Sequence, residues 1–221
     1  MGEVLFVTGT DTDVGKTYIS ALLAKKMKAN YYKPVLSGAK WVNGRLIAMD
    51  AKFVLDECRR GEIHPNDCVS YLFEETCSPH LASCHANIAI ELKKIREDYQ
   101  NVKKKSDYLV VEGAGGLICP LKEDELMLID VIKELTLPIV IVSNSHLGAI
   151  NQVMLTVEYA RSQGIKIAGI MMNHFVKGDL ICEDNLKMIE KLSGIQVIDT
   201  VAKGQKELAI SAKKLTSFFE K

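Results

Sequence analysis

The segment VTGTDTDVGKT, residues 7–17, constrains the fold of this chain more than any other feature. It follows the apolar run EVLFVT (3–8) and leads into a stretch with helical character at 16–29. A glycine-rich loop that ends in Gly-Lys-Thr, between a buried strand and a helix, presents backbone N–H groups to phosphate oxygens. We therefore expect a strand, a phosphate-binding loop and a helix in direct succession at the amino terminus.

The rest of the chain alternates short β-branched runs with longer amphipathic stretches. The expected strands are 3–8, 31–35, 107–113, 138–143, 167–173 and 195–199. The expected helices are 16–29, 49–60, 87–105, 126–136, 149–163, 183–193 and 205–219. This alternation predicts an α/β fold in which helices flank a mostly parallel sheet. Together with the phosphate-binding loop, it is typical of a P-loop NTPase-like fold. We expect residues 1–221 to form one such domain.

Composition narrows the functional class. The chain has 28 Lys plus Arg and 28 Asp plus Glu, and a net charge of zero argues against broad nucleic-acid or acidic-membrane binding. The start MGEVLFVTG is too short and too charged for a signal peptide, and no run reaches the ~20 apolar residues of a membrane helix. The spacing of Cys77, His80, Cys84 and His85 fits no common metal site. We expect a cytoplasmic protein with free thiols.

The loop itself assigns residues to the parts of a nucleotide. The backbone from Asp13 to Thr17 can cradle phosphate oxygens at the positive end of the following helix. The Lys16 ammonium can reach the β- and γ-phosphates, and the Thr17 hydroxyl can ligate Mg²⁺. The expected nucleotide-binding residues here are Asp13, Val14, Gly15, Lys16, Thr17 and Tyr18.

Two positions depart from the common form of this loop. Its first glycine is Gly9, and Thr10 occupies the place where most such loops have glycine. Asp11 occupies the position at which partitioning-type ATPases carry a signature lysine. The sequence GTDTDVGKT instead resembles the phosphate loop of the dethiobiotin synthetase family.

Further segments resemble the same family in the same order, from residue 4 to about residue 175. They are YYKPVLSG (31–38), MDA (49–51), CSPHLAS (77–83), VVEGAGGLICPL (110–121), HLGAIN (146–151) and IMMN (170–173). The chain departs from the family at His146, where the family has a lysine. It also departs at 197–207, which lacks a Gly-x-Ile/Leu-Pro segment that lines the nucleotide base.

The resemblance implies a ligase of biotin biosynthesis. The family converts 7,8-diaminononanoate, CO₂ and ATP into dethiobiotin, ADP and phosphate, with Mg²⁺. It implies that Lys33, together with Lys16, carries the catalysis, and that Thr12 and Ser37 hydrogen-bond the diamine and its carbamate. It also implies a homodimer in which the helix start formed by Gly148, Ala149, Ile150 and Asn151 holds the substrate carboxylate of the partner subunit.

The remaining expected residues bind the metal and the nucleotide. Thr17, Asp50 and Glu112 supply the hydroxyl and carboxylate oxygens that Mg²⁺ prefers. Gly113, Gly115 and Gly116 let the backbone approach a ligand closely, with Ala114 among them, and Asn173 can offer its amide to adenine. Structural alternatives remain open for several of these residues: Lys33 as a surface lysine of a strand, Asp50 as a helix N-cap, and Glu112 as a salt-bridged structural acid. Thr12 and Ser37 also fit plain turn residues, and Gly148 to Asn151 an unliganded helix start.

Two other functions compete with the synthetase. One is a nucleotide-switched, partitioning-type ATPase that acts through protein partners, against which Asp11 argues. The other is an amidating relative that acts on cobyrinate, for which 221 residues leave no room for a glutaminase domain.

Overall fold

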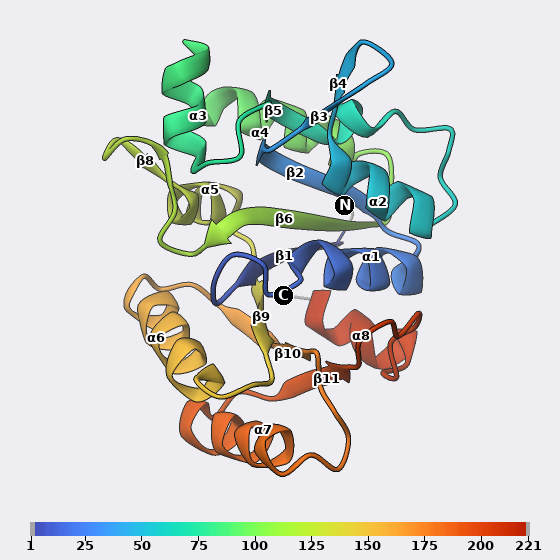
Figure 1. The fold of residues 1–221 in the computed structure, drawn as a ribbon, viewed down its shortest axis with the longest axis vertical. Helices are drawn as coiled ribbons and strands as arrows, with labels where there is room; N and C mark the ends of the chain where they lie inside the picture. Colours follow the sequence, from blue (N-terminus) through green and yellow to red (C-terminus); the bar gives the residue numbers. More distant parts are fainter. Residues whose placement is uncertain (1–2, 220–221) are drawn as a thin grey trace.

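The computed structural model describes residues 3–219. Seven parallel strands form one sheet in the order β11-β10-β9-β1-β6-β2-β5 (Figure 1). The strands are β1 (Glu3–Gly9), β2 (Asn30–Ser37), β5 (Val69–Phe73), β6 (Tyr108–Gly116), β9 (Ile139–Asn144), β10 (Ile167–Asn173) and β11 (Val197–Val201). The expected parallel α/β fold is therefore confirmed.

Helices cover both faces of this sheet. One face packs against α1 (Lys16–Met27), α2 (Met49–Glu57) and α8 (Ala212–Phe219). The other packs against α3 (Pro79–Ala86), α4 (Leu92–Lys103), α5 (Leu128–Leu135), α6 (Ala149–Ser162) and α7 (Leu180–Ser193). Figure 1 shows α8 beside α1, and α7 beside α6. Because both faces are covered, the central strands carry apolar side chains on both faces over most of their length rather than alternating.

Short elements complete the chain. They are a 3₁₀ turn, η1 (Pro65–Cys68), and two antiparallel hairpins, one of β3 (Lys40–Val42) with β4 (Arg45–Ile47) and one of β7 (Pro120–Lys122) with β8 (Leu126–Met127). Among residues 3–219, no helix has both the length and the apolar character needed to cross a bilayer.

Several boundaries differ from the sequence-based expectation. The edge strand β5 and the eight-residue helix α3 were not foreseen, because neither shows a long periodic pattern. The helix expected at 87–105 begins only at Leu92, and the one expected at 126–136 follows the short strand β8. The helix expected at 205–219 begins at Ala212, since Gly204 adopts a left-handed φ of 78° and the chain turns there.

The parallel sheet places the functional loops together at the carboxyl ends of its strands. In parallel strands the carboxyl ends lie on the same side, so the chain leaves β1, β2 and β6 at neighbouring points. After β1 the chain continues into α1 on one face of the sheet, whereas after β9 it continues into α6 on the other face. Folds of this kind bind ligands where neighbouring strands lead to opposite faces, which here is the end of β1.

Candidate active site

Gly9 ends β1 and begins the phosphate loop. A Cβ atom at this position would lie 2.8 Å from the Asp11 carbonyl oxygen and 2.8 Å from Val14 Cγ2. No side chain fits there, because the loop folds back directly over the strand end. Thr10 lies in the bend that follows β1, and its N–H donates to the Val142 carbonyl at 2.9 Å. The displaced glycine is therefore required by the shape of this loop.

Gly15 closes the loop and caps α1. Its φ of 92° lies in the left-handed region, and a Cβ there would lie 2.1 Å from Asn173 Nδ2. That amide nitrogen donates to the Val14 carbonyl at 3.0 Å, so Asn173 supports the loop from the end of β10. Asn173 Oδ1 is buried and has no hydrogen-bond partner within residues 3–219. The Asn173 amide nitrogen is thus used to hold the loop, whereas the amide oxygen Oδ1 is available to accept a hydrogen bond from a purine amino group.

We expect Asn173→Ala to weaken turnover in two separable ways. The Val14 carbonyl loses its partner, which lowers kcat/KM for every nucleotide by up to about tenfold. If Oδ1 accepts from the adenine amino group, the preference for ATP over GTP, expected to be modest with a single contact, also falls toward one. Measuring kcat/KM for ATP and GTP in both proteins checks this. An ATP preference that survives the substitution would assign base reading to another segment, such as the loop 202–207.

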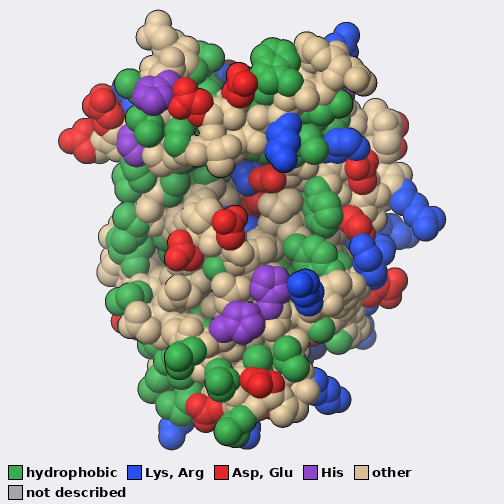
Figure 2. All heavy atoms as spheres, in the orientation of Figure 1, with side chains coloured by type: hydrophobic (Ala, Val, Ile, Leu, Met, Phe, Trp, Pro, Cys, Tyr) green, Lys and Arg blue, Asp and Glu red, His purple; other side chains and the backbone are tan. Residues whose placement is uncertain are grey.

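A cavity of about 790 Å³ lies beside the loop at the carboxyl ends of β1, β2 and β6. It opens as a hollow on the face shown in Figure 2, where acidic and basic side chains gather. The structure brings many of the expected site residues into its lining: Thr12, Asp13, Gly15, Lys16, Thr17, Lys33, Ser37, Asp50, Glu112, Ala114 and Gly115.

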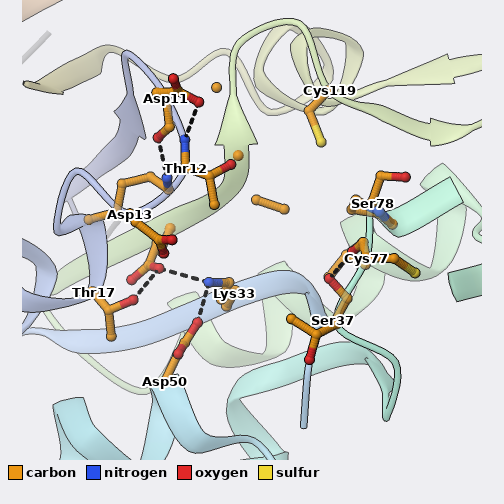
Figure 3. A pocket seen from close by; sticks show the side chains of 18 of the residues that line it. Asp11, Thr12, Asp13, Thr17, Lys33, Ser37, Asp50, Cys77, Ser78 and Cys119 are labelled. Atoms are coloured by element: carbon orange, nitrogen blue, oxygen red, sulfur yellow. Dashed lines mark hydrogen bonds and ion pairs between the residues drawn. The ribbon is translucent and has the colours of Figure 1, made fainter. Parts of the chain in front are cut away.

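Lys33 lies at the centre of the charged groups in this cavity. Its Nζ donates to Glu112 Oε1 at 2.8 Å and to Asp50 Oδ2 at 2.5 Å, as the dashed lines of Figure 3 show for Asp50. Burial opposes the charge on Lys33, but the Glu112 and Asp50 carboxylates outweigh it and raise its pKa above 10.5. Lys33 is only 7% exposed, so the alternative of a surface strand lysine is wrong.

Asp50 enters from α2, and Glu112 from β6. The N-cap of α2 is Ala48 and not Asp50, so the alternative of an Asp50 cap is also wrong. The Asp50 side chain is 38% exposed and faces the cavity, whereas Glu112 is fully buried. A buried carboxylate needs strong donors, and the Lys33 ammonium and the Thr17 hydroxyl, at 2.8 Å, both meet Glu112 Oε1.

The donor set of Thr17, Asp50 and Glu112 fits Mg²⁺. One hydroxyl and two carboxylates from three segments converge around Lys33, and all are hard oxygen ligands. Within residues 3–219 no three His, Cys, Asp or Glu side chains are grouped to hold a metal by themselves. A cation here would take its other ligands from water and phosphate, as Mg²⁺ commonly does.

Lys16 lies over the loop at the start of α1. Its Nζ donates to the Asp11 carbonyl at 2.8 Å, and the residue is 7% exposed. Burial lowers the pKa of this ammonium from 10.5, although the nearby Glu112 carboxylate opposes the shift. The charge of Lys16 is therefore poorly solvated and available to an anion in the loop.

Two further segments form the wall of the cavity opposite the loop. Both fall within motifs that resemble the family, but the resemblance assigned no role to their individual residues. Residues 76–79 lead into α3, which begins at Pro79, and residues 118–120 follow β6. Ser37 Oγ donates to the Cys77 carbonyl at 2.6 Å, which ties β2 to this wall (Figure 3). Burial raises the pKa of the Cys119 thiol to about 11, so it lines the wall as an uncharged group.

Several expected residues do not line this cavity. A Cβ on Gly113 would lie 2.9 Å from both Phe6 Cε1 and Leu128 Cδ2, so this glycine allows close packing behind the site. The Tyr18 hydroxyl donates to the Gln205 carbonyl and fastens the C-terminal loop to α1. Gly148, with a φ of 95°, does begin α6, but the segment of Gly148, Ala149, Ile150 and Asn151 lies outside the cavity of its own chain.

Comparisons with known proteins agree with this geometry. A family model described as an AAA domain matches residues 3–205. The ATP-dependent dethiobiotin synthetase BioD of Clostridium perfringens is 46% identical over 210 residues, which is 92% of each chain. The chain belongs to the dethiobiotin synthetase family. Another dethiobiotin synthetase, from Brachyspira hyodysenteriae, is 38% identical over an alignment of 228 residues that covers all of both chains.

Solved structures share the fold at much lower identity. A ParA family ATPase from Chlorobium tepidum has a TM-score of 0.57 and 13% identity, covering 91% of this chain and 85% of that one. The MinC:MinD complex of Aquifex aeolicus gives a TM-score of 0.55 at 14% identity, covering 99% and 85%. These likenesses show that the chain shares its fold with these two proteins and show nothing further about activity.

Proposed function

We propose that this chain catalyses the ATP-dependent carboxylation and ring closure of 7,8-diaminononanoate with CO₂, giving dethiobiotin, ADP and phosphate. One observation carries the proposal: the phosphate loop and the Lys33–Glu112–Asp50 group line a single cavity. Relatives that align with all or nearly all of the chain are named for this synthesis. The cavity, at about 790 Å³, is large enough for a nucleotide end and a small substrate together.

The chemistry asks for placed cations rather than a strong nucleophile. One amine of the substrate captures CO₂ as a carbamate, which accepts the γ-phosphoryl group of ATP. The second amine then attacks the activated carbon, closes the cyclic urea and releases phosphate. Lys33 is charged and fixed by two carboxylates, so it can stabilise the carbamate oxygens. Thr12 and Ser37 line the same cavity and supply hydrogen bonds to the substrate.

Phosphoryl transfer depends on the loop. The Lys16 ammonium lies above the loop backbone, where it would neutralise charge that builds on the transferring group. Thr17, Asp50 and Glu112 would hold Mg²⁺, which would supply positive charge close to the phosphates.

The proposal includes a homodimer with shared sites and a cytoplasmic location. The start of α6 lies outside its own cavity, and Leu147 beside it is 90% exposed. The Ala149 N–H already donates to the His146 carbonyl, so the N–H groups of Ile150 and Asn151 are the ones that suit a carboxylate, here the distal carboxylate of a substrate held by the partner. The six free cysteines fit a reducing compartment.

We expect subunit mixing to restore activity. A Lys16→Ala chain lacks the phosphate contact, and an Asn151→Trp chain blocks the helix start with a bulky side chain at an exposed position. A mixed dimer would carry one intact site, so phosphate release should recover to a fraction of the wild-type rate. Heterodimers that form and remain inactive would show that each site is built within one chain.

The experiment that tests the function is a phosphate-release assay. Release should require both the diamine and bicarbonate, and dethiobiotin should form in equal amount. A partitioning-type ATPase would respond instead to DNA, a membrane or a protein partner, and an amidating enzyme to glutamine. Phosphate release that ignores the diamine would overturn the proposal.

A further inference from the structure

Glu112 has a third partner, on the side of the carboxylate that faces away from the cavity. The Tyr31 hydroxyl donates to Glu112 Oε2 at 2.9 Å, while Lys33 and Thr17 both hold Oε1. Tyr31 is 1% exposed and does not line the large cavity. It lines a separate cavity of about 220 Å³ instead. The two oxygens of one carboxylate are thus held from opposite sides.

The register of the sheet explains this contact. In the pairing of β2 with β6, Tyr31 lies opposite Val110. Side chains two residues apart point to the same face of a strand, so Lys33 shares a face with Tyr31, and Glu112 shares it with Val110. Tyr31 therefore lies two residues before Lys33 on the same face of β2, farther from the cavity, and its hydroxyl reaches Glu112 from the interior of the protein.

We infer that Tyr31 is a positioning residue for the metal-binding carboxylate of Glu112. Its hydroxyl fixes the rotation of the carboxylate, so that Oε1 stays beside the Thr17 hydroxyl and the Lys33 ammonium. The inference rests on the proposed function only in taking Glu112 as a ligand of the magnesium ion. Partners behind a metal ligand orient it in this way and influence metal affinity almost as much as the ligand does.

The contact is a one-way hydrogen bond. The Tyr31 hydroxyl is the donor, because the oxygens of an ionised carboxylate can only accept hydrogen bonds. Both residues are buried, so this hydrogen bond orients Glu112 Oε2 in a place from which water is excluded.

The chain provides a matched control in the next residue. Tyr32 is equally buried but points to the opposite face of β2, where its hydroxyl contacts Ser70 Oγ at 2.6 Å and the Ile95 carbonyl at 3.1 Å. Neither partner belongs to the cavity lining. Tyr31→Phe and Tyr32→Phe each remove one buried hydroxyl, and only the first touches the site.

The test is a Mn²⁺ titration of the wild type and both variants with ADP present, in which electron paramagnetic resonance measures the free and bound Mn²⁺. We expect Tyr31→Phe to weaken Mn²⁺ binding about 10- to 100-fold, and Tyr32→Phe to leave it within about twofold. The Mg²⁺ concentration for half-maximal phosphate release should rise by a similar factor in Tyr31→Phe alone. Replacing Tyr31 with 4-aminophenylalanine, which keeps an N–H donor, should recover much of the affinity.

Equal Mn²⁺ affinity in the two phenylalanine variants would overturn the inference. If Tyr31→Phe folds poorly, 4-fluorophenylalanine fills the space of the hydroxyl without donating, and the same comparison decides. The titration is independent of the overall reaction. A wild-type protein that makes no dethiobiotin would refute the proposed function, while the metal affinities would still decide the role of Tyr31.

Discussion

Lys16→Ala should reduce diamine-dependent phosphate release by ~10²-fold or more while the protein remains folded. Among the described residues this ammonium donates a hydrogen bond to the Asp11 carbonyl alone, and its burial disfavours the charge. Its removal therefore takes little from the folded state. The loss appears where negative charge builds on the transferring phosphoryl group, which lowers kcat more than it raises KM for ATP.

The measurement is steady-state phosphate release at saturating diamine and bicarbonate, together with urea unfolding. Lys25→Ala is a matched control, because Lys25 lies in the same helix with its side chain exposed. It should retain wild-type turnover. A well-folded Lys16→Ala protein with near-normal kcat would contradict the assignment of residues 9–17 as the phosphate loop.

Lys33→Met should lower both the activity and the stability of the protein. The Lys33 ammonium joins Glu112, which is fully buried, to Asp50. Methionine keeps much of the volume but leaves the Glu112 charge without its main counter-ion, and breaking a buried pair in this way costs about 3–5 kcal/mol. Turnover should fall by ~10²-fold or more, since the carbamate loses its cation.

The double variant Lys33→Met/Glu112→Gln separates these two effects. Glutamine removes the unpaired charge, so the free energy of unfolding in urea should recover most of its loss. Activity should stay low, because the cation at the cavity and a metal-binding carboxylate are both absent. If the single variant unfolds at the wild-type urea concentration, Glu112 is stabilised by groups other than Lys33, and the electrostatic account of the site is wrong.

The sequence alone was sufficient to predict the fold and the phosphate loop. The loop needs only local features, namely an apolar strand, two glycines and a Lys-Thr pair at a helix start, and these are contiguous between residues 3 and 17. The parallel sheet follows from runs that are apolar on both faces, such as 107–113. The edge strand β5 was missed because five residues at the sheet edge are only partly buried and carry little periodicity.

The resemblance to a family indicated Lys33, Asp50 and Glu112, but only the tertiary structure placed them. They lie in three separate segments, and nothing in their spacing states that one ammonium lies between two carboxylates. For Asn173, the sequence suggested a role that the tertiary structure changes in part. Its place at a strand end suggested a contact with the base, whereas the folded chain commits its amide nitrogen to the Val14 carbonyl.

What the sequence determined by itself was therefore whatever depends on neighbouring residues: the loop, the order of most strands and helices, and the family. The tertiary structure decided whatever depends on strand register and crossover. Tyr31 is the clearest case, because it reaches Glu112 only through the alignment of Tyr31 with Val110 across β2 and β6. That alignment joins residues 79 or more positions apart, and the free energy that fixes it comes from burying both faces of the sheet rather than from any local preference.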